Sequence, residues 1–353
     1  MVRRLSGLRV IDMDTADEIL AIPVNEPERL FQAPDQITGQ YHRLAKLWHP
    51  DHAGGQRDVF EHLTLLRDEA NLHVSQGRWQ VPGLLELAGR KIRYFKSYPF
   101  ELGTAYVGNS IIAYVVEKDF LSLAHRAEAA IRGLTFANDR MATEMLLRLP
   151  QIKSAFDTDQ GQRVLVMEKP AGLVRLSDLI SHFGSKVDPR HVAWVMSDLL
   201  NTACYLGSFR QLAHAGLCTD TVFISPKGHV AVILGGWFYS TPLNEPLVAL
   251  PEWTDQLLPA AARNTERASG AIDLELIRGI GREMLGETSG VSIGEDNAIP
   301  QAMRDWLQRP SGLDAKGEYR AWIKALEDSF GARRFTELSV NASDVYGKDA
   351  HNG

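Results

Sequence analysis

The triplet His49-Pro50-Asp51 places the strongest local constraint on how this chain can fold. Pro50 disfavours the helical conformation at the residue before it, so a helix that reaches His49 must end there. The preceding segment, 40–48, carries apolar side chains at helical spacing on one face and basic side chains on another. A second amphipathic segment includes Val59. The pattern predicts two antiparallel helices with the triplet exposed at the tip of the hairpin.

The basic face of the first helix consists of His42, Arg43 and Lys46. Together with the triplet, this face resembles the J-domain of DnaJ-type co-chaperones, in which a basic helix ends in an HPD loop and a second core helix follows. The resemblance rests on YHRLAKLWHPDHAGG followed by VFEHLTLLRDEA, with a short first helix expected over residues 18–22. The connection over residues 23–36 is longer than is usual in that family.

The resemblance implies a contact with a partner protein and no catalytic group in this hairpin. The Asp51 carboxylate is expected to meet an arginine-rich surface of a DnaK-type (heat-shock seventy) chaperone ATPase, beside His49 and Pro50. The basic face is expected to steer docking on an acidic surface of that chaperone. The alternative is an ordinary helix–loop–helix, in which His49 and Asp51 cap each other and the basic face is only solvated.

From about residue 92 the sequence contains short runs of β-branched and aromatic residues, which are typical of strands. Apolar residues at helical spacing return at residue 176. This order of elements resembles a protein kinase. Segment 164–168 is similar to the last small-lobe strand and hinge, and segment 142–149 resembles the helix whose Glu pairs with the nucleotide-anchoring Lys. The residues that would then line a residual nucleotide cleft are Glu144, Met167 and Glu168.

The chemistry of a kinase is missing from the corresponding positions. Phosphoryl transfer in that family needs a catalytic Asp, an Asn, a DFG Asp and a Lys on the phosphates. By resemblance, His214 opens the catalytic loop. Gly216 then stands for the catalytic Asp, Thr221 for the Asn and Leu234 for the DFG Asp. None of these three supplies a carboxylate, so the resemblance implies a pseudokinase.

Of the other kinase features, the anchoring cation has no clear match in this sequence, whereas the buried Asp of the large lobe has one. Lys118 and Arg132 are the candidates for the anchoring cation, and neither falls in a convincing strand. Asp273 falls on the helix whose buried Asp holds the catalytic loop in kinases. Two alternatives stay open: an unrelated α+β domain, and a remodelled phosphotransferase that uses Asp220. Aromatic runs such as 237–239 usually fill a gap in the core, and we interpret this one as a repacked activation segment.

Composition limits the partners and the compartment. The 353 residues include 38 Lys+Arg against 44 Asp+Glu, a net charge of -6, so we expect no nucleic-acid and no membrane partner. Two cysteines, Cys204 and Cys218, cannot build a disulfide framework and fit a reducing compartment. No apolar stretch approaches the roughly 20 residues of a spanning helix. We expect a cytoplasmic protein with no metal site and no cofactor.

The expected fold class is multidomain, an all-α J-domain helical hairpin followed by an α+β, kinase-like two-lobed domain. The expected segments are an N-terminal extension (1–14), a J-domain (15–80), a linker (81–94), a small lobe with hinge (95–175), a helical large lobe (176–340) and a flexible tail (341–353).

These patterns predict a non-enzymatic co-chaperone that stimulates a DnaK-type ATPase, with the kinase-like domain as an adaptor for an unidentified client or target. The alternatives are an atypical nucleotide-binding protein, or an inhibitor that sequesters the chaperone.

Overall fold

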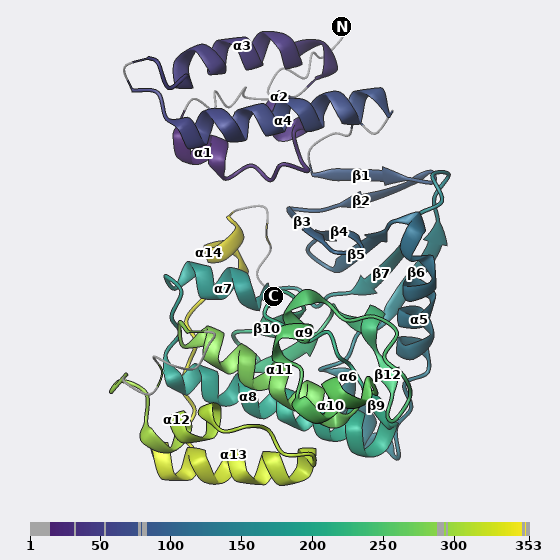
Figure 1. The fold of residues 1–353 in the computed structure, drawn as a ribbon, viewed down its shortest axis with the longest axis vertical. Helices are drawn as coiled ribbons and strands as arrows, with labels where there is room; N and C mark the ends of the chain where they lie inside the picture. Colours follow the sequence, from purple (N-terminus) through teal and green to yellow (C-terminus); the bar gives the residue numbers. More distant parts are fainter. Residues whose placement is uncertain are drawn as a thin grey trace, which may run out of the picture. The chain divides into compact units, whose positions relative to one another are not determined.

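The computed structural model describes residues 15–31, 33–52, 54–76, 79, 83–287, 293, 296–347 and 350, and it divides into two compact units (Figure 1). Unit 1 comprises Met1–Phe100 and unit 2 comprises Glu101–Gly353. The expected N-terminal extension, 1–14, lies outside the described residues. Helices and antiparallel strands together make a mixed α+β structure. Within the described residues, no helix is both long and apolar enough to cross a membrane.

Unit 1 begins with helices that share one core. They are α1 (Ala16–Leu20), α2 (Glu28–Phe31), the 3-10 helix η1 (Pro34–Gln36), α3 (Ile37–Trp48) and α4 (Arg57–Ser75). Helices α1 and α3 both pack against α4. Their shared core is formed by Ile19, Ile22, Leu30, Phe31, Ile37, Tyr41, Leu44, Val59, Leu63, Leu66 and Ala70. The two amphipathic helices expected on either side of Pro50 are therefore present, with their apolar stripes facing inward.

The long connection between α1 and α3 is fastened to α4 by two histidines. His73 Nδ1 lies 2.6 Å from the buried Glu28 carboxylate of α2, and its Nε2 lies 3.2 Å from Glu69. His62 Nε2 lies 2.9 Å from the carbonyl oxygen of Ile22. These contacts give the Glu28 carboxylate and the Ile22 carbonyl oxygen partners inside the fold, so the extra length is accommodated as packed structure.

The expected linker at 81–94 is corrected over most of its length. Strands β1 (Leu84–Leu87) and β2 (Arg90–Arg93) form an antiparallel hairpin there. Ala88 and Gly89 connect them with φ values of 47° and 71°. Two successive positive φ angles are the geometry of a tight two-residue hairpin turn. Strand structure therefore begins before the expected start near residue 92, and β3 (Lys96–Phe100) ends unit 1.

Unit 2 begins with antiparallel strands backed by a helix. The elements are β4 (Gly103–Val107), β5 (Ile111–Val116), the 3-10 helix η2 (Lys118–Phe120), α5 (Leu121–Arg132), α6 (Asp139–Leu146), β6 (Ile152–Asp157) and β7 (Arg163–Glu168). The strands pair in the order β4-β5-β7-β6. Helix α5 packs on β6 and β7, while the shorter α6 follows it in the connection to β6. The helix that packs on these strands is α5, and the segment 142–149, compared above with the helix that carries the pairing Glu, falls on α6 and the residues after it.

The remainder of unit 2 is mainly helical. Its helices are α7 (Leu176–His182), α8 (Pro189–Cys204), the π-helix η3 (Tyr205–Arg210), the 3-10 helix η4 (Trp237–Tyr239), α9 (Glu252–Leu257), α10 (Ala260–Thr265), α11 (Gly270–Met284), α12 (Gln301–Gln308) and α13 (Ala315–Phe330). Its short strands are β8 (Val174–Arg175), β9 (Leu212–Ala213), β10 (Val222–Ser225), β11 (Val230–Ile233) and β12 (Thr241–Pro242). Helix α8 packs against both α11 and α13.

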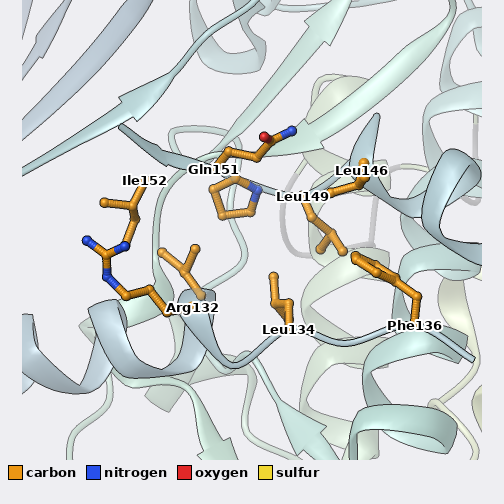
Figure 2. A pocket seen from close by; sticks show the side chains of 9 residues that line it. Arg132, Leu134, Phe136, Leu146, Leu149, Gln151 and Ile152 are labelled. Atoms are coloured by element: carbon orange, nitrogen blue, oxygen red, sulfur yellow. The ribbon is translucent and has the colours of Figure 1, made fainter. Parts of the chain in front are cut away.

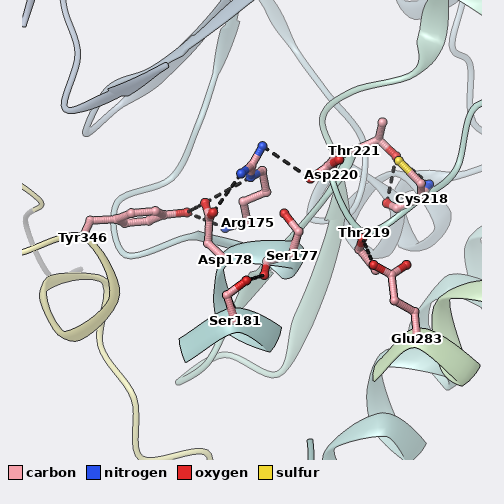
Figure 3. A network of polar contacts seen from close by, with 10 residues as sticks. All are labelled: Arg175, Ser177, Asp178, Ser181, Cys218, Thr219, Asp220, Thr221, Glu283 and Tyr346. Carbon is pink, nitrogen blue, oxygen red and sulfur yellow. Dashed lines mark hydrogen bonds and ion pairs between the residues drawn. The ribbon is translucent and has the colours of Figure 1, made fainter. Parts of the chain in front are cut away.

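The expected flexible tail is also corrected over its described part. Residues Ala342–Tyr346 form α14, which packs on α7. The Tyr346 hydroxyl donates to Asp178 Oδ2 at 2.8 Å and accepts from the Arg175 backbone N–H at 2.8 Å (Figure 3). One aromatic side chain with two partly buried hydrogen bonds orders a segment whose composition is otherwise that of a loose terminus.

The core of unit 1 gives a stability prediction. Leu63 on α4 is completely buried, so Leu63→Ala is expected to lower the free energy of unfolding by about 2–5 kcal/mol through lost burial and a cavity. The matched control is Leu65→Ala on the same helix, because Leu65 is 54% exposed and its truncation is expected to cost within about 0.5 kcal/mol. Chemical denaturation with hydrogen exchange of the α3 and α4 amides measures both. Equal losses would contradict the assigned core.

Candidate functional site

The triplet forms a compact turn between α3 and α4. His49 leaves the helix with φ -61° and ψ 135°, the extended conformation expected before Pro50. Its carbonyl oxygen accepts from the His52 N–H at 2.9 Å, and the Asp51 N–H donates to His49 Nδ1 at 3.2 Å. The Asp51 side chain remains 87% exposed. The turn therefore presents its carboxylate to solvent, as the sequence predicted.

The shape of this turn depends on a close approach of backbone to backbone. A Cβ at Gly55 would lie 1.9 Å from the His49 carbonyl oxygen, so no other residue fits there without moving the turn. The His49 ring packs edge-on against Phe60, with centroids 4.9 Å apart. His49 Nδ1 also lies 3.6 Å from Asp51 Oδ2. Of the mutual capping considered as an alternative, one half is present, because the His49 ring accepts from the Asp51 N–H while the Asp51 carboxylate stays accessible.

The three basic residues lie together on the exposed side of α3. His42, Arg43 and Lys46 are all exposed, whereas Tyr41 and Leu44 face the core. The Lys46 ammonium and the Arg43 guanidinium thus border the same helix end that leads into the turn. This arrangement is an exposed cationic face beside an exposed carboxylate.

In unit 2, a buried carboxylate holds the loop that resembles a catalytic loop. Asp273 on α11 is 2% exposed and accepts the backbone N–H groups of His214 and Ala215, both at 2.8 Å. This confirms the contact expected for Asp273. Burial raises the pKa of Asp273 to about 6, although the two N–H donors act in the opposite direction. Burial lowers the pKa of the His214 imidazole to about 3.

The position compared with the catalytic Asp has no space for a side chain. A Cβ on Gly216 would lie 2.5 Å from the Gly236 carbonyl oxygen and 2.8 Å from Tyr239 Cδ2. Gly236 itself has φ +77°, and a Cβ there would lie 2.2 Å from the Gly216 carbonyl oxygen. The two glycines pack backbone against backbone. The loop is therefore closed where an acidic side chain would have to project.

Thr221 and Leu234, the positions compared with the catalytic Asn and the DFG Asp, both make contacts within the protein. The Thr221 hydroxyl accepts from the Cys218 N–H at 2.9 Å and lies within donating distance of the Gly216 and Cys218 carbonyl oxygens. Leu234 is 1% exposed. The aromatic residues that follow, 237–239, are all buried, as expected for a run that fills the core. These side chains stabilise the loop and offer no open ligand set.

The three residues expected to line a residual nucleotide cleft differ in their surroundings. Glu144 is exposed on α6 and pairs with Arg140 of the same helix at 3.1 Å, so it does not reach a cation on a strand. Met167 is fully buried within the sheet, and Glu168 is exposed at the end of β7. The resemblance makes 142–149 the helix whose Glu would pair with an anchoring Lys, and the ion pair that the structure records for Glu144 is the one with Arg140.

The candidate cations for that pairing also lie off the strands. Lys118 is exposed in η2, and Arg132 ends α5, where it pairs with Glu128 at 3.0 Å. Glu128 is bonded at 2.7 Å to Arg163 as well, at the start of β7. The charged pair between α5 and the sheet thus uses an arginine on β7, and β5 contributes only apolar and aromatic side chains.

A polar network that the sequence did not suggest lies beside the loop. Arg175 bonds to both oxygens of Asp178, at 2.8 and 3.0 Å, and reaches Asp220 at 3.4 Å (Figure 3). Asp220 is the acid considered for a remodelled phosphotransferase, and its side chain is 58% exposed. Tyr346 completes the network from the C-terminal segment. No periodic signal in the sequence links residues so far apart.

No protein-family model matches the chain, and no curated protein matches it. In the part of the chain that the structure describes, no group of three or more His, Cys, Asp and Glu side chains could hold a metal ion.

The closed loop gives a prediction for Gly216. Gly216→Ala is expected to lower the free energy of unfolding by about 1–3 kcal/mol, since its Cβ meets backbone atoms that cannot move aside independently. Gly270→Ala is the matched control, because the nearest atom to a Cβ there is 4.0 Å away. Thermal and chemical unfolding measure both variants. A fully stable Gly216→Ala protein would show that the loop is open in solution.

The buried imidazole gives a pH prediction. The folded protein keeps His214 neutral down to about pH 3, whereas the unfolded chain protonates it near its ordinary pKa of 6.5. The unfolded state therefore binds more protons between these values, and the stability that neutral His214 contributes is lost as pH falls. Asp273 changes the stability with pH in the opposite direction. Because its pKa is raised to about 6 in the folded state, it stabilises the fold at low pH, and this stabilisation is lost as pH rises through about 6.

Comparing wild type with His214→Leu separates the two contributions, since Asp273 is present in both proteins. On acidification from about pH 7 to about pH 4.5, wild type is expected to lose stability relative to the variant. Denaturant titrations across that range measure the difference, with His182→Leu at an exposed histidine as the control. A difference that does not change with pH would refute the buried neutral imidazole.

Proposed function

We propose that this protein is a non-enzymatic, J-domain-type co-chaperone of the cytoplasm. Unit 1 docks on a DnaK-type chaperone and stimulates its ATPase, and unit 2 is a pseudokinase-like adaptor for a client or target protein. The observation that carries the proposal is the turn at His49-Pro50-Asp51, which displays a carboxylate that is 87% exposed beside the cationic face of α3.

Charge and shape support a docking role for this turn. A carboxylate held on a short, backbone-bonded turn can accept paired hydrogen bonds from an arginine without first ordering a flexible loop. The exposed His42, Arg43 and Lys46 would accelerate encounter with an acidic surface. Both features are expected of a module that acts by contact with a partner.

The loop of unit 2 supports the non-enzymatic part of the proposal. Transfer of a phosphoryl group needs carboxylates that orient the acceptor and hold magnesium. At the positions compared with these groups stand Gly216, where a Cβ already collides with backbone, Thr221, whose hydroxyl is used inside the loop, and the buried Leu234. A domain of this kind offers surface for recognition, and we assign it the recruitment of the client.

Single-turnover ATP hydrolysis by a purified DnaK-type chaperone tests the function of unit 1. Wild-type protein is expected to accelerate hydrolysis, and Asp51→Asn is expected to abolish the acceleration because it removes the charge that pairs with arginine. The matched control is Asp58→Asn, an exposed carboxylate in the first turn of α4, which is expected to stimulate as wild type does.

Two outcomes would contradict the proposal. Equal stimulation by wild type and Asp51→Asn would remove the triplet from the contact. Slower hydrolysis with wild type, relieved by Asp51→Asn, would show instead an inhibitor that occupies the chaperone through the same turn. Circular dichroism of each variant verifies that the exposed substitutions leave the helices folded.

A further inference from the structure

The ring nitrogen Nδ1 of His49 lies between a donor and an acceptor that belong to one residue, Asp51. The Asp51 backbone N–H donates to Nδ1 at 3.2 Å, and the carboxylate oxygen Oδ2 of the same residue lies 3.6 Å from it. An imidazole nitrogen accepts a hydrogen bond only without a proton and donates one only with a proton. A single proton on Nδ1 therefore determines whether His49 bonds the backbone or the carboxylate of Asp51.

The neutral ring corresponds to the turn as the structure describes it. Because Nδ1 accepts from the Asp51 N–H, this hydrogen bond assigns the ring proton of neutral His49 to Nε2. The bond closes the turn locally and leaves the Asp51 side chain 87% exposed. In this state the carboxylate is available to an arginine of a partner protein.

A proton on Nδ1 would reverse both interactions. The Asp51 N–H and the new Nδ1–H would be two donors that face each other, so the bond that closes the turn would be lost. The Nδ1–H would instead meet Oδ2, and a small rotation of the exposed Asp51 side chain would bring the two atoms from 3.6 Å to hydrogen-bond distance. The imidazolium and the carboxylate also attract each other. The carboxylate would then be taken up inside the turn.

The surroundings of the ring allow this exchange without a rearrangement of the helices. The His49 side chain is 42% exposed, so solvent can deliver the proton. Its ring lies edge-on to Phe60 of α4 and to His52, with centroids 4.9 and 6.0 Å apart. The contact with Phe60 restrains the ring beside the turn, so either bond to Asp51 can form from nearly the same ring position.

The charged groups near the ring offer its proton one carboxylate. In the described ranges, Asp51 is the one carboxylate within ion-pair distance of the His49 ring. Arg57 and Glu61 at the start of α4 pair with each other at 2.7 Å. The other charged or titratable groups on the nearest parts of the turn and the helices are His52, then His42, Arg43 and Lys46 on α3, and Asp58 and His62 on α4.

We propose that His49 is a proton-operated switch for the docking of unit 1 on the chaperone. Neutral His49 presents the Asp51 carboxylate, and protonated His49 withdraws it into the turn. The inference rests on the co-chaperone function proposed above and adds the regulation of its contact site. Histidine changes charge between about pH 5 and about pH 8, so acidification within that range is expected to weaken docking. Competition from an exposed ion pair corresponds to a loss of about two- to fivefold in affinity.

Nuclear magnetic resonance of the full-length protein, without chaperone, tests the switch itself. With isotope-labelled histidine and aspartate, the His49 and Asp51 signals are assigned by their absence from spectra of His49→Asn and Asp51→Asn. At about pH 8, His49 Nδ1 is expected to give the nitrogen shift of an unprotonated acceptor. On acidification to about pH 6, the Asp51 amide is expected to lose its hydrogen-bonded shift with the same midpoint as the His49 ring. The amide of the exposed Asp58 is the control and is expected not to follow that midpoint.

Surface plasmon resonance with a purified DnaK-type chaperone tests the effect on docking, at several values between about pH 8 and about pH 6. Every protein carries His42→Gln and His52→Gln, because protonation of these two residues would add positive charge and accelerate encounter with an acidic surface. In this background, the protein with His49 is expected to lose about two- to fivefold in affinity on acidification relative to His49→Asn. The Asn side-chain oxygen can accept the Asp51 N–H, as Nδ1 does, and takes up no proton.

The two measurements separate the switch from the co-chaperone proposal. An Asp51 amide that stays unchanged while the His49 ring titrates would refute the switch and leave the chaperone contact untouched. An affinity ratio between the two proteins that is constant with pH would overturn the regulation of docking even if both proteins bind. If His49→Asn does not bind, the affinity of the His49 protein must fall with the midpoint of its ring, and a different midpoint overturns the proposal. Absence of binding by every protein at every pH would refute the co-chaperone function and with it the regulation of docking.

Discussion

The buried carboxylate of Asp273 is the interaction on which the centre of unit 2 depends. Because it accepts the N–H groups of His214 and Ala215 together, the chain must turn sharply, and Ala215 takes φ +57°. The Thr254 hydroxyl holds the same turn by donating to the Ala215 carbonyl oxygen at 2.9 Å. This turn carries Gly216 into backbone contact with Gly236. The carboxylate of Asp273 thus shapes the loop.

The support of a loop and the reactivity of its side chains depend on different atoms. The support needs one acceptor beneath the backbone, which Asp273 provides. Reactivity needs side chains that project outward, and Gly216 has none while the Thr221 hydroxyl is bonded within the loop. The neutral His214 fills the interior beside Trp237, with ring centroids 4.8 Å apart. The proposal of a recognition domain follows from this division.

Local signals were sufficient where one residue determines the backbone. Pro50 fixed the end of α3, and helical spacing identified the core face that contains Leu44. Local signals failed where tertiary contacts determine which side chains form a pair. Glu128 and Glu144 both lie on amphipathic helices, and only the packing of α5 on the sheet selects the first for an ion pair with the strands. Tyr346 is a single aromatic residue in a polar tail, and its bond to Asp178 spans 168 positions of sequence.

The turn at Asp51 and the wall of a pocket in unit 2 that Leu134 and Phe136 line (Figure 2) are both shaped by residues that lie outside them. The turn at Asp51 keeps its shape because Gly55 allows the His49 carbonyl to approach, although Gly55 need not touch a partner. The pocket keeps its wall because Tyr205 and Arg210 hold Thr135 from a π-helix, and neither lines the pocket. A strained helix persists only if other contacts compensate for it. The bonds to Thr135 are those contacts, so the π-helix and the pocket wall stabilise each other and should be lost together.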